Sequence, residues 1–219
     1  MKEPLQNNPL MPPILLAMTV ATGMVDAVSF LALGRVFTAN MTGNVVLLGF
    51  ALAGVPGLSI TKSFLALAGF MTGAVAGGRM ATHAGSPESD RWVVRAFFFE
   101  SLLLLASAAV SLGSLKVEAV VVLTAAAMGM RNAVIRKLAV PDLTTTVLTM
   151  TITGLAADSF LAGGNDLRWQ RRVAAILALP AGALAGALML HYSAALPLCV
   201  CGVVSALCAF TLERQRRQQ

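Results

Sequence analysis

The chain has 219 residues, of which 57% are hydrophobic and only 12% are charged. Soluble globular domains carry about 25% charged residues, so this composition excludes a soluble globule and predicts an integral membrane protein. The net charge of +6 does not indicate a nucleic-acid partner, because the Lys and Arg residues lie mostly in short gaps between apolar runs. The surroundings that the composition predicts are the lipid bilayer.

The first half of the chain contains four apolar runs, at residues 14–33, 40–55, 64–80 and 94–112. The first run has about the 20 residues that a bilayer requires, and it follows Pro12 and Pro13, where a helix can start. The second run is shorter and begins with polar residues. It predicts either a short span or a helix that enters and leaves the membrane on one side.

The second half contains four more apolar runs, at residues 117–135, 143–161, 173–190 and 196–212. The run at 143–161 is the weakest of these, because it is rich in threonine and contains Asp158. The loop at 163–172 is basic and contains Trp169, a combination that is typical of a membrane interface. The whole chain is therefore expected to be helical.

Two pairs of segments match at nearly constant offsets. ATGMVDAV at 21–28 shares five of eight residues with AMGMRNAV at 127–134, an offset of 106. GAVAG at 73–77 shares four of five residues with GALAG at 182–186, an offset of 109. These matches predict two internal repeats, about 12–113 and about 117–212, inside a single membrane domain that covers residues 1–219.

The distribution of basic residues distinguishes six spans from eight. If all eight runs cross the membrane, the Lys and Arg residues outside the spans divide nine against six between the two sides. If the second and sixth runs are short broken or re-entrant helices, the division is twelve against three. The positive-inside rule favours the second arrangement, with both termini cytoplasmic and the second half inverted relative to the first. We predict an all-α polytopic transmembrane helix bundle of this kind, with eight spans as the alternative.

Asp26 is a carboxylate inside the first apolar run. An ionised side chain in hydrocarbon costs several kcal/mol unless it is paired or faces water, so Asp26 is a functional-site candidate. The alternative is a structural ion pair. Arg131 is the expected partner in either case, because its neighbour Asn132 is the repeat equivalent of Asp26.

A polar segment, FTANMTGN at 37–44, follows Asp26 and contains residue types that cap helix starts. The N-terminus of a helix beginning there presents unpaired amides and a partial positive charge to an anion, unless Thr38 or Asn40 caps it. With the equivalent stretch of the second half, the residues predicted to bind a substrate or a coupling ion are Asp26, Thr38, Asn40, Thr42, Asn44, Arg131, Asn132, Thr146 and Asp158.

The same stretch resembles the signature of the YoaK-like family, through FTANMTGN and the residues Gly23, Asp26, Ala27, Ser29 and Phe30. That family is bacterial, multi-pass and functionally uncharacterised. The resemblance therefore implies a location in the bacterial inner membrane and a helical fold, but no activity. The second-half equivalent of FTANMTGN is LTTTVLTM at 143–150, which keeps little of the signature.

Glycines recur at a spacing of four in two of the apolar runs, at Gly73 and Gly77 and at Gly182 and Gly186. This spacing allows helix backbones to approach closely, so we expect these glycines in helix–helix contacts. The same glycine-containing helix faces would also allow two copies of the chain to pack together as a homo-oligomer.

The cysteines, the histidines and the sequence motifs predict no metal site, no cofactor site and no enzyme active site. The three cysteines fit neither a CxxC site nor a disulfide framework, and neither histidine has a ligand at metal-binding spacing. The motifs of intramembrane proteases are absent from the sequence. The predicted function is a small secondary transporter or permease for an unidentified small molecule or ion, with a polar site at the repeat interface. A non-transporting assembly or sensor protein is the alternative.

Overall fold

A computed structural model describes residues 8–83, 91–113, 117–140, 143, 145–146 and 148–218. Most of the polar loop at 83–91, together with Thr144 and Val147 of the weak run at 143–161, lies outside these residues. The regular structure within them is helical throughout: α1 (Met11–Leu31), α2 (Met41–Leu52), α3 (Ile60–Thr82), α4 (Arg91–Leu112), α5 (Val117–Leu138), α6 (Thr149–Ala157), the 3-10 helix η2 (Phe160–Ala162), α7 (Trp169–Met189) and α8 (Ala195–Gln218).

Six of the described helices are long and apolar enough to cross a membrane, namely α1, α3, α4, α5, α7 and α8. Helix α2 has 12 residues and α6 has nine. At 1.5 Å per residue they extend about 18 Å and about 14 Å, well short of the roughly 30 Å hydrocarbon core. The prediction of six spans with two short helices is confirmed. Helix α6 lies within the predicted run at 143–161 and covers only part of it, from Thr149 to Ala157.

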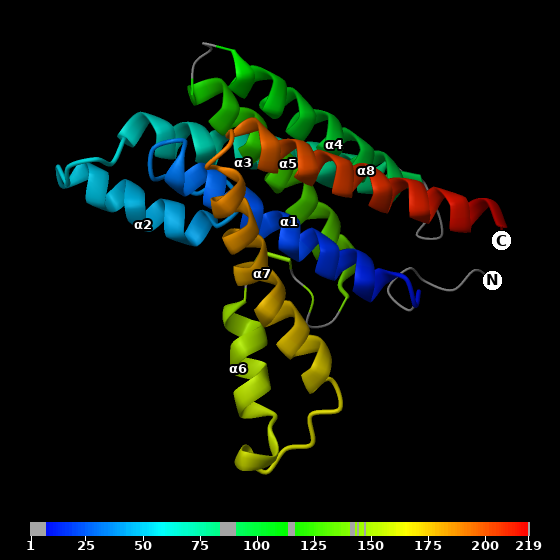
Figure 1. The fold of residues 1–219 in the computed structure, drawn as a ribbon. Helices are drawn as coiled ribbons and strands as arrows, with labels where there is room; N and C mark the ends of the chain where they lie inside the picture. Colours follow the sequence, from blue (N-terminus) through cyan, green and yellow to red (C-terminus); the bar gives the residue numbers. More distant parts are fainter. Residues whose placement is uncertain are drawn as a thin grey trace.

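The spans pack in pairs that each combine the two halves of the chain. Helix α3 lies on α5, α7 on α1 and α4 on α8, while α1, α4, α5 and α8 surround the centre (Figure 1). Helices α4 and α8 run antiparallel, because Glu100 is bonded to Ser205 whereas the next residue, Ser101, is bonded to the earlier residue Gly202. The start of α1 and the end of α8 lie at the same end of the bundle, where Asn8 is hydrogen-bonded to Gln215 (Figure 1).

Glycines allow α3 to lie directly on α5 and α7 to lie directly on α1. A Cβ atom added at Gly73 would lie 1.9 Å from the carbonyl oxygen of Ala126, and one added at Gly182 would lie 1.9 Å from that of Val20. Both distances are far inside van der Waals contact, so each crossing requires a residue without a side chain.

The partner helices at these two crossings, α5 and α1, also have a glycine at the contact. A Cβ atom at Gly129 of α5 would lie 2.0 Å from the carbonyl oxygen of Phe70, and one at Gly23 of α1 would lie 2.1 Å from that of Leu179. Gly23 and Gly129 are 106 residues apart, and Phe70 and Leu179 are 109 residues apart. The two crossings therefore use positions that match at the two offsets found in the sequence.

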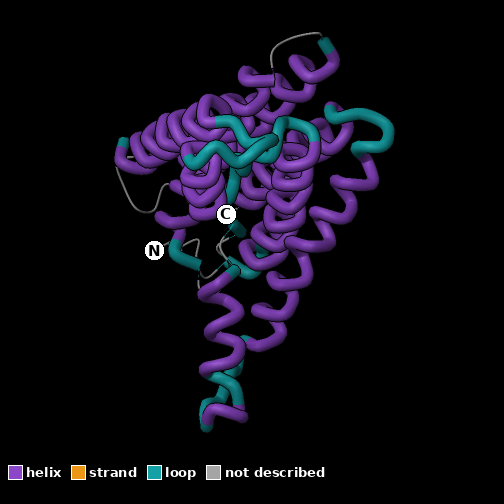
Figure 2. The backbone as a smooth tube through the Cα atoms, turned by 90° about the vertical axis from the view of Figure 1, so that its left-hand side faces the viewer, coloured by secondary structure: helices purple, strands orange, loops and turns teal. Residues whose placement is uncertain are grey.

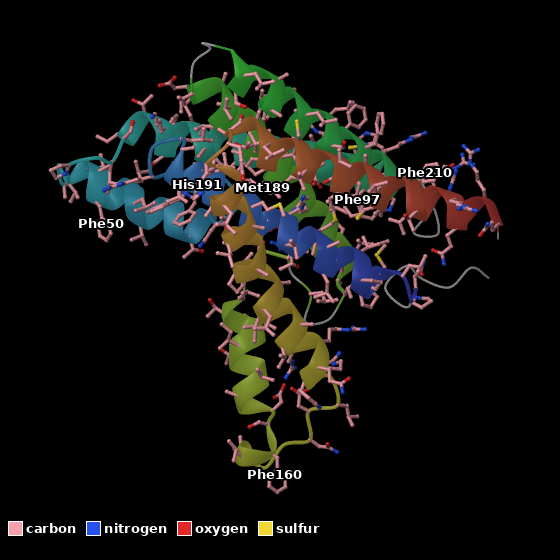
Figure 3. The ribbon with its side chains drawn as sticks, viewed as in Figure 1. Phe50, Phe97, Phe160, Met189, His191 and Phe210 are labelled. Carbon is pink, nitrogen blue, oxygen red and sulfur yellow. The ribbon has the colours of Figure 1, made fainter. Side chains whose placement is uncertain are left out.

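Helix α6, η2 and the N-terminal part of α7 form a helical hairpin that projects from the rest of the bundle (Figures 1 and 2). Arg172 of α7 holds its two arms together through Asp158 at 2.8 Å and Asp166 at 2.9 Å. Large apolar side chains cover the outer surface of the molecule: Phe50, Phe160 and Phe210 are exposed, whereas Phe97 is buried in the core (Figure 3). An apolar exterior is what contact with lipid requires.

Candidate functional site

A buried ion pair joins α4 to α5 at the centre of the bundle. The side chains of Glu100 and Arg131 are both fully buried. Arg131 Nε donates to Glu100 Oε1 at 3.0 Å, and Nη2 donates to the same oxygen. Ser205 of α8 donates to that oxygen at 2.6 Å. The second carboxylate oxygen, Oε2, has no hydrogen-bond partner among the described residues.

The same guanidinium also reaches α1. Its Nη1 donates to the carbonyl oxygen of Met18 at 2.8 Å and to Thr22 Oγ1 at 2.9 Å. One cation thus connects α1, α4, α5 and α8. A charge in hydrocarbon is tolerated when it is paired and hydrogen-bonded, and Arg131 meets both conditions. We call Glu100, Arg131, Ser205 and Thr22 the central network.

Arg131 does not have the partner that the sequence suggested. It pairs with Glu100, and no ion pair or hydrogen bond links it to Asp26 in the part of the chain that the structure describes. Asp26 lies one turn further along α1 than Thr22. Glu100 was missed, although it is a lone carboxylate in the apolar run FFFESLLLL, and the cost of an intramembrane charge applies to it as it does to Asp26.

A second polar group surrounds the end of α1 and the start of α2. Asp26 is half-buried, and the backbone amide of Ala39 interacts with its carboxylate. Thr38 and Asn44 are 0% and 1% exposed. Asn44 Nδ2 donates to the carbonyl oxygen of Ser63 at 2.9 Å and so ties α2 to α3. We call Asp26, Thr38 and Asn44 the α2 group.

The α2 group is incompletely hydrogen-bonded. Asp26 Oδ1, Thr38 Oγ1 and Asn44 Oδ1 are buried and have no partner among the described residues. They are three of only five such side-chain atoms in the described chain. Buried polar atoms nearly always have a partner, so an unpaired set of oxygens indicates a place for water, an ion or a ligand.

The other predicted residues of this segment have different roles. Asn40 caps α2, because its side-chain oxygen accepts a hydrogen bond from the backbone amide of Gly43 at 3.1 Å. The self-capping alternative therefore holds for Asn40. Thr42 is exposed on the first turn of α2.

In the second half, Asn132 and Thr146 come together. Thr146 Oγ1 donates to Asn132 Oδ1 at 2.5 Å, and Asn132 Nδ2 donates to the carbonyl oxygen of Met128 at 2.8 Å. Both side chains line a cavity of about 680 Å³ between α3 and α5. Asp158 lies elsewhere, on the projecting hairpin with Arg172. The predicted site residues thus fall into separate places. No cluster of three metal-binding side chains occurs within the described ranges.

Six apolar spans around a buried ion pair define this chain as a polytopic α-helical membrane protein. It belongs to the family described as "Protein of unknown function (DUF1275)", whose profile matches residues 14–211. It is 33% identical over 150 residues to the UPF0700 transmembrane protein YoaK of Bacillus subtilis (strain 168), which confirms the resemblance to YoaK-like proteins. That alignment covers 66% of this chain and 65% of the relative, so the chain spans about two thirds of the relative's length. No solved structure matches the chain.

Proposed function

We propose that the protein is a small secondary transporter whose substrate or coupling ion binds at the α2 group. The observation that carries this proposal is the set of three buried, unpartnered oxygens on Asp26, Thr38 and Asn44. They lie beside a helix too short to span the bilayer. Irregular backbone and unpaired polar groups at membrane depth are tolerated only where they are buried in protein or line a water-filled cavity.

The relation between the two halves supports this proposal. We infer that α1–α4 and α5–α8 are two inverted repeats, with α2 and α6 at equivalent positions. The glycine crossings of α3 with α5 and of α7 with α1 match at offsets of 109 and 106, and α4 runs antiparallel to α8. Inverted repeats with interrupted helices near the bilayer midplane are the architecture of many secondary transporters.

The two polar groups then have different roles. The central network fixes the positions of α1, α4, α5 and α8, because all four helices contribute to it. Asp26, with one unpaired oxygen, changes its protonation state or its partner during transport. We place the protein in the inner membrane with both termini in the cytoplasm.

This topology has a direct test. Reporter fusions at Lys62, at the start of α3, and at Arg168, just before α7, should report opposite sides of the membrane. With six spans Lys62 is external and Arg168 internal, because α2 and α6 return to the side on which they begin. Fusions that report the same side would contradict the inverted arrangement.

Transport itself is tested with purified protein in proteoliposomes adsorbed on a solid-supported membrane. Concentration jumps of Na⁺, H⁺, amino acids, carboxylates, sugars and organic cations should give a transient current for at least one class. Asp26→Asn should abolish that current while the protein stays folded. Glu213→Gln is the matched control, because among the described residues the ion pairs of Glu213 are to Arg216 and Arg217 of its own helix.

Two results would count against the proposal. A normal current from Asp26→Asn would remove this carboxylate from the transport site. No current from folded wild-type protein with any class of solute would favour the assembly or sensor alternative.

A further inference from the structure

The cavity between α3 and α5 has one apolar wall. Phe70, Ala74 and Gly78 line it from α3 at a spacing of four residues, and Ile135 lines it from α5. Met71 and Val75, the sequence neighbours of the first two, are 60% and 52% exposed. The apolar wall therefore borders the lipid-facing surface of α3, and it suits a hydrocarbon chain better than a water-soluble molecule.

The end of the cavity at the last turn of α5 is basic. Arg136 and Lys137 both line the cavity and are exposed. Neither forms an ion pair with any residue that the structure describes. Among the described residues the cavity lining contains no carboxylate, so these residues present a bound anion with two positive charges.

Asn132 and Thr146 also line the cavity. Phe70 lies beside Gly129 of α5, and Asn132 follows Gly129 along that helix. The two basic residues come one turn after Asn132. Along α5 the order is therefore hydrocarbon, a neutral polar group and positive charge. A phospholipid has the same order of acyl chain, ester-linked glycerol and phosphate.

We propose that this cavity binds an anionic phospholipid, with its phosphate at Arg136 and Lys137 and an acyl chain against Phe70 and Ala74. Basic pockets between membrane-spanning helices are known sites for anionic lipid headgroups. Long basic side chains near helix ends also extend toward the headgroup region, where such a phosphate lies. The proposal does not depend on transport activity.

The test compares phosphatidylglycerol with phosphatidylcholine, by native mass spectrometry of the delipidated protein in detergent. We expect the wild-type protein to retain phosphatidylglycerol with at least about tenfold preference, because both lipids offer a phosphate for charge-assisted contacts but the choline cation of phosphatidylcholine offsets its negative charge beside Arg136 and Lys137. The double variant Arg136→Gln/Lys137→Gln should reduce this preference to within about twofold. The double variant Arg91→Gln/Arg95→Gln is the matched control, because it removes two exposed charges from α4 that do not line the cavity.

A second variant tests the apolar part of the site without changing charge. A Cβ atom at Gly78 would meet no atom within 4 Å, so Gly78→Leu fills open space in the cavity without a clash. It should weaken phosphatidylglycerol binding and leave folding intact, even if the charge variant fails to fold.

Three results would overturn the proposal. The first is equal retention of both lipids by the wild-type protein. The second is unchanged phosphatidylglycerol binding in Gly78→Leu or in the Arg136 and Lys137 double variant. The third is displacement of phosphatidylglycerol by millimolar glycerol phosphate, because that would assign the site to a soluble anion.

Discussion

The central network and the α2 group both place polar residues among membrane spans, and they differ in how completely those residues are paired. Arg131 donates to Glu100, Met18, Thr22 and Ser205. The α2 group leaves three buried oxygens without a partner among the described residues. The central network leaves one such oxygen, Glu100 Oε2, but that carboxylate is paired with a cation through its other oxygen. In the α2 group the unpaired oxygens belong to three residues that pair with no described cation, and such oxygens require water, an ion or a ligand. We infer from this difference that the network serves stability and that the α2 group serves function.

The largest effect should come from breaking the central pair on one side. Glu100→Gln or Arg131→Gln leaves an uncompensated charge in the bundle and should destabilise the protein by about 3–5 kcal/mol. The double variant Glu100→Gln/Arg131→Gln should recover much of this loss. Thermal unfolding in detergent measures each variant.

Asp26→Asn is the comparison for this experiment, because it removes a carboxylate that pairs with no cation in the described chain. Its unfolding temperature should stay close to the wild-type value. If Asp26→Asn is as unstable as Glu100→Gln, the division between a structural and a functional carboxylate is wrong.

A somewhat smaller effect is expected at the glycine crossings. Gly73→Leu or Gly182→Leu forces a side chain against a backbone carbonyl 1.9 Å away, so the paired helices must separate. Overpacking of this kind costs about 1–3 kcal/mol or more and should lower the yield of folded protein in size-exclusion chromatography. Gly78→Leu, on the same helix as Gly73 but facing open space, is the control. Equal yields for Gly73→Leu and Gly78→Leu would contradict the close crossing.

The smallest of these stability effects is expected at the start of α2. Asn40→Ala removes the side-chain cap and should cost about 1 kcal/mol, whereas Asn40→Asp keeps an acceptor and should cost less. Hydrogen exchange of the first-turn amides of α2 reports the change locally. No difference in exchange between the two variants would show that α2 is held by Asn44 and Ser63 rather than by its cap.

The spans could be predicted from the sequence because hydropathy and length decide them. Residues 14–33 contain most of α1, and the short run after FTANMTGN became the 12-residue helix α2. The later start of α6 could not be predicted by hydropathy, since threonine and leucine are both tolerated in a span. In the structure α6 begins at Thr149, and the described residues 143, 145, 146 and 148 lie before it.

The partner of Arg131 was harder to predict, because pairing depends on which helix faces turn inward. The repeat alignment placed Asp26 opposite Asn132 and so pointed to Asp26, whereas the packing of α4 on α5 brings Glu100 to Arg131. Hydropathy alone does not show which face of each helix turns toward the centre of the bundle. A lone carboxylate in FFFESLLLL was nevertheless visible, so Glu100 was available in the sequence as a second candidate partner for Arg131 beside Asp26.

The most direct test of the account is cysteine labelling at one position of each group, in a background with the three native cysteines replaced by serine. Asp26→Cys should react with a membrane-impermeant maleimide, because we propose that a substrate or ion reaches the α2 group from water. Thr22→Cys, one turn away on the same helix, should remain unlabelled, because Thr22 is 0% exposed and lies against Arg131 in the central network. Reaction at Thr22 with none at Asp26, or no reaction at either, would contradict the claim that the α2 group is the functional site.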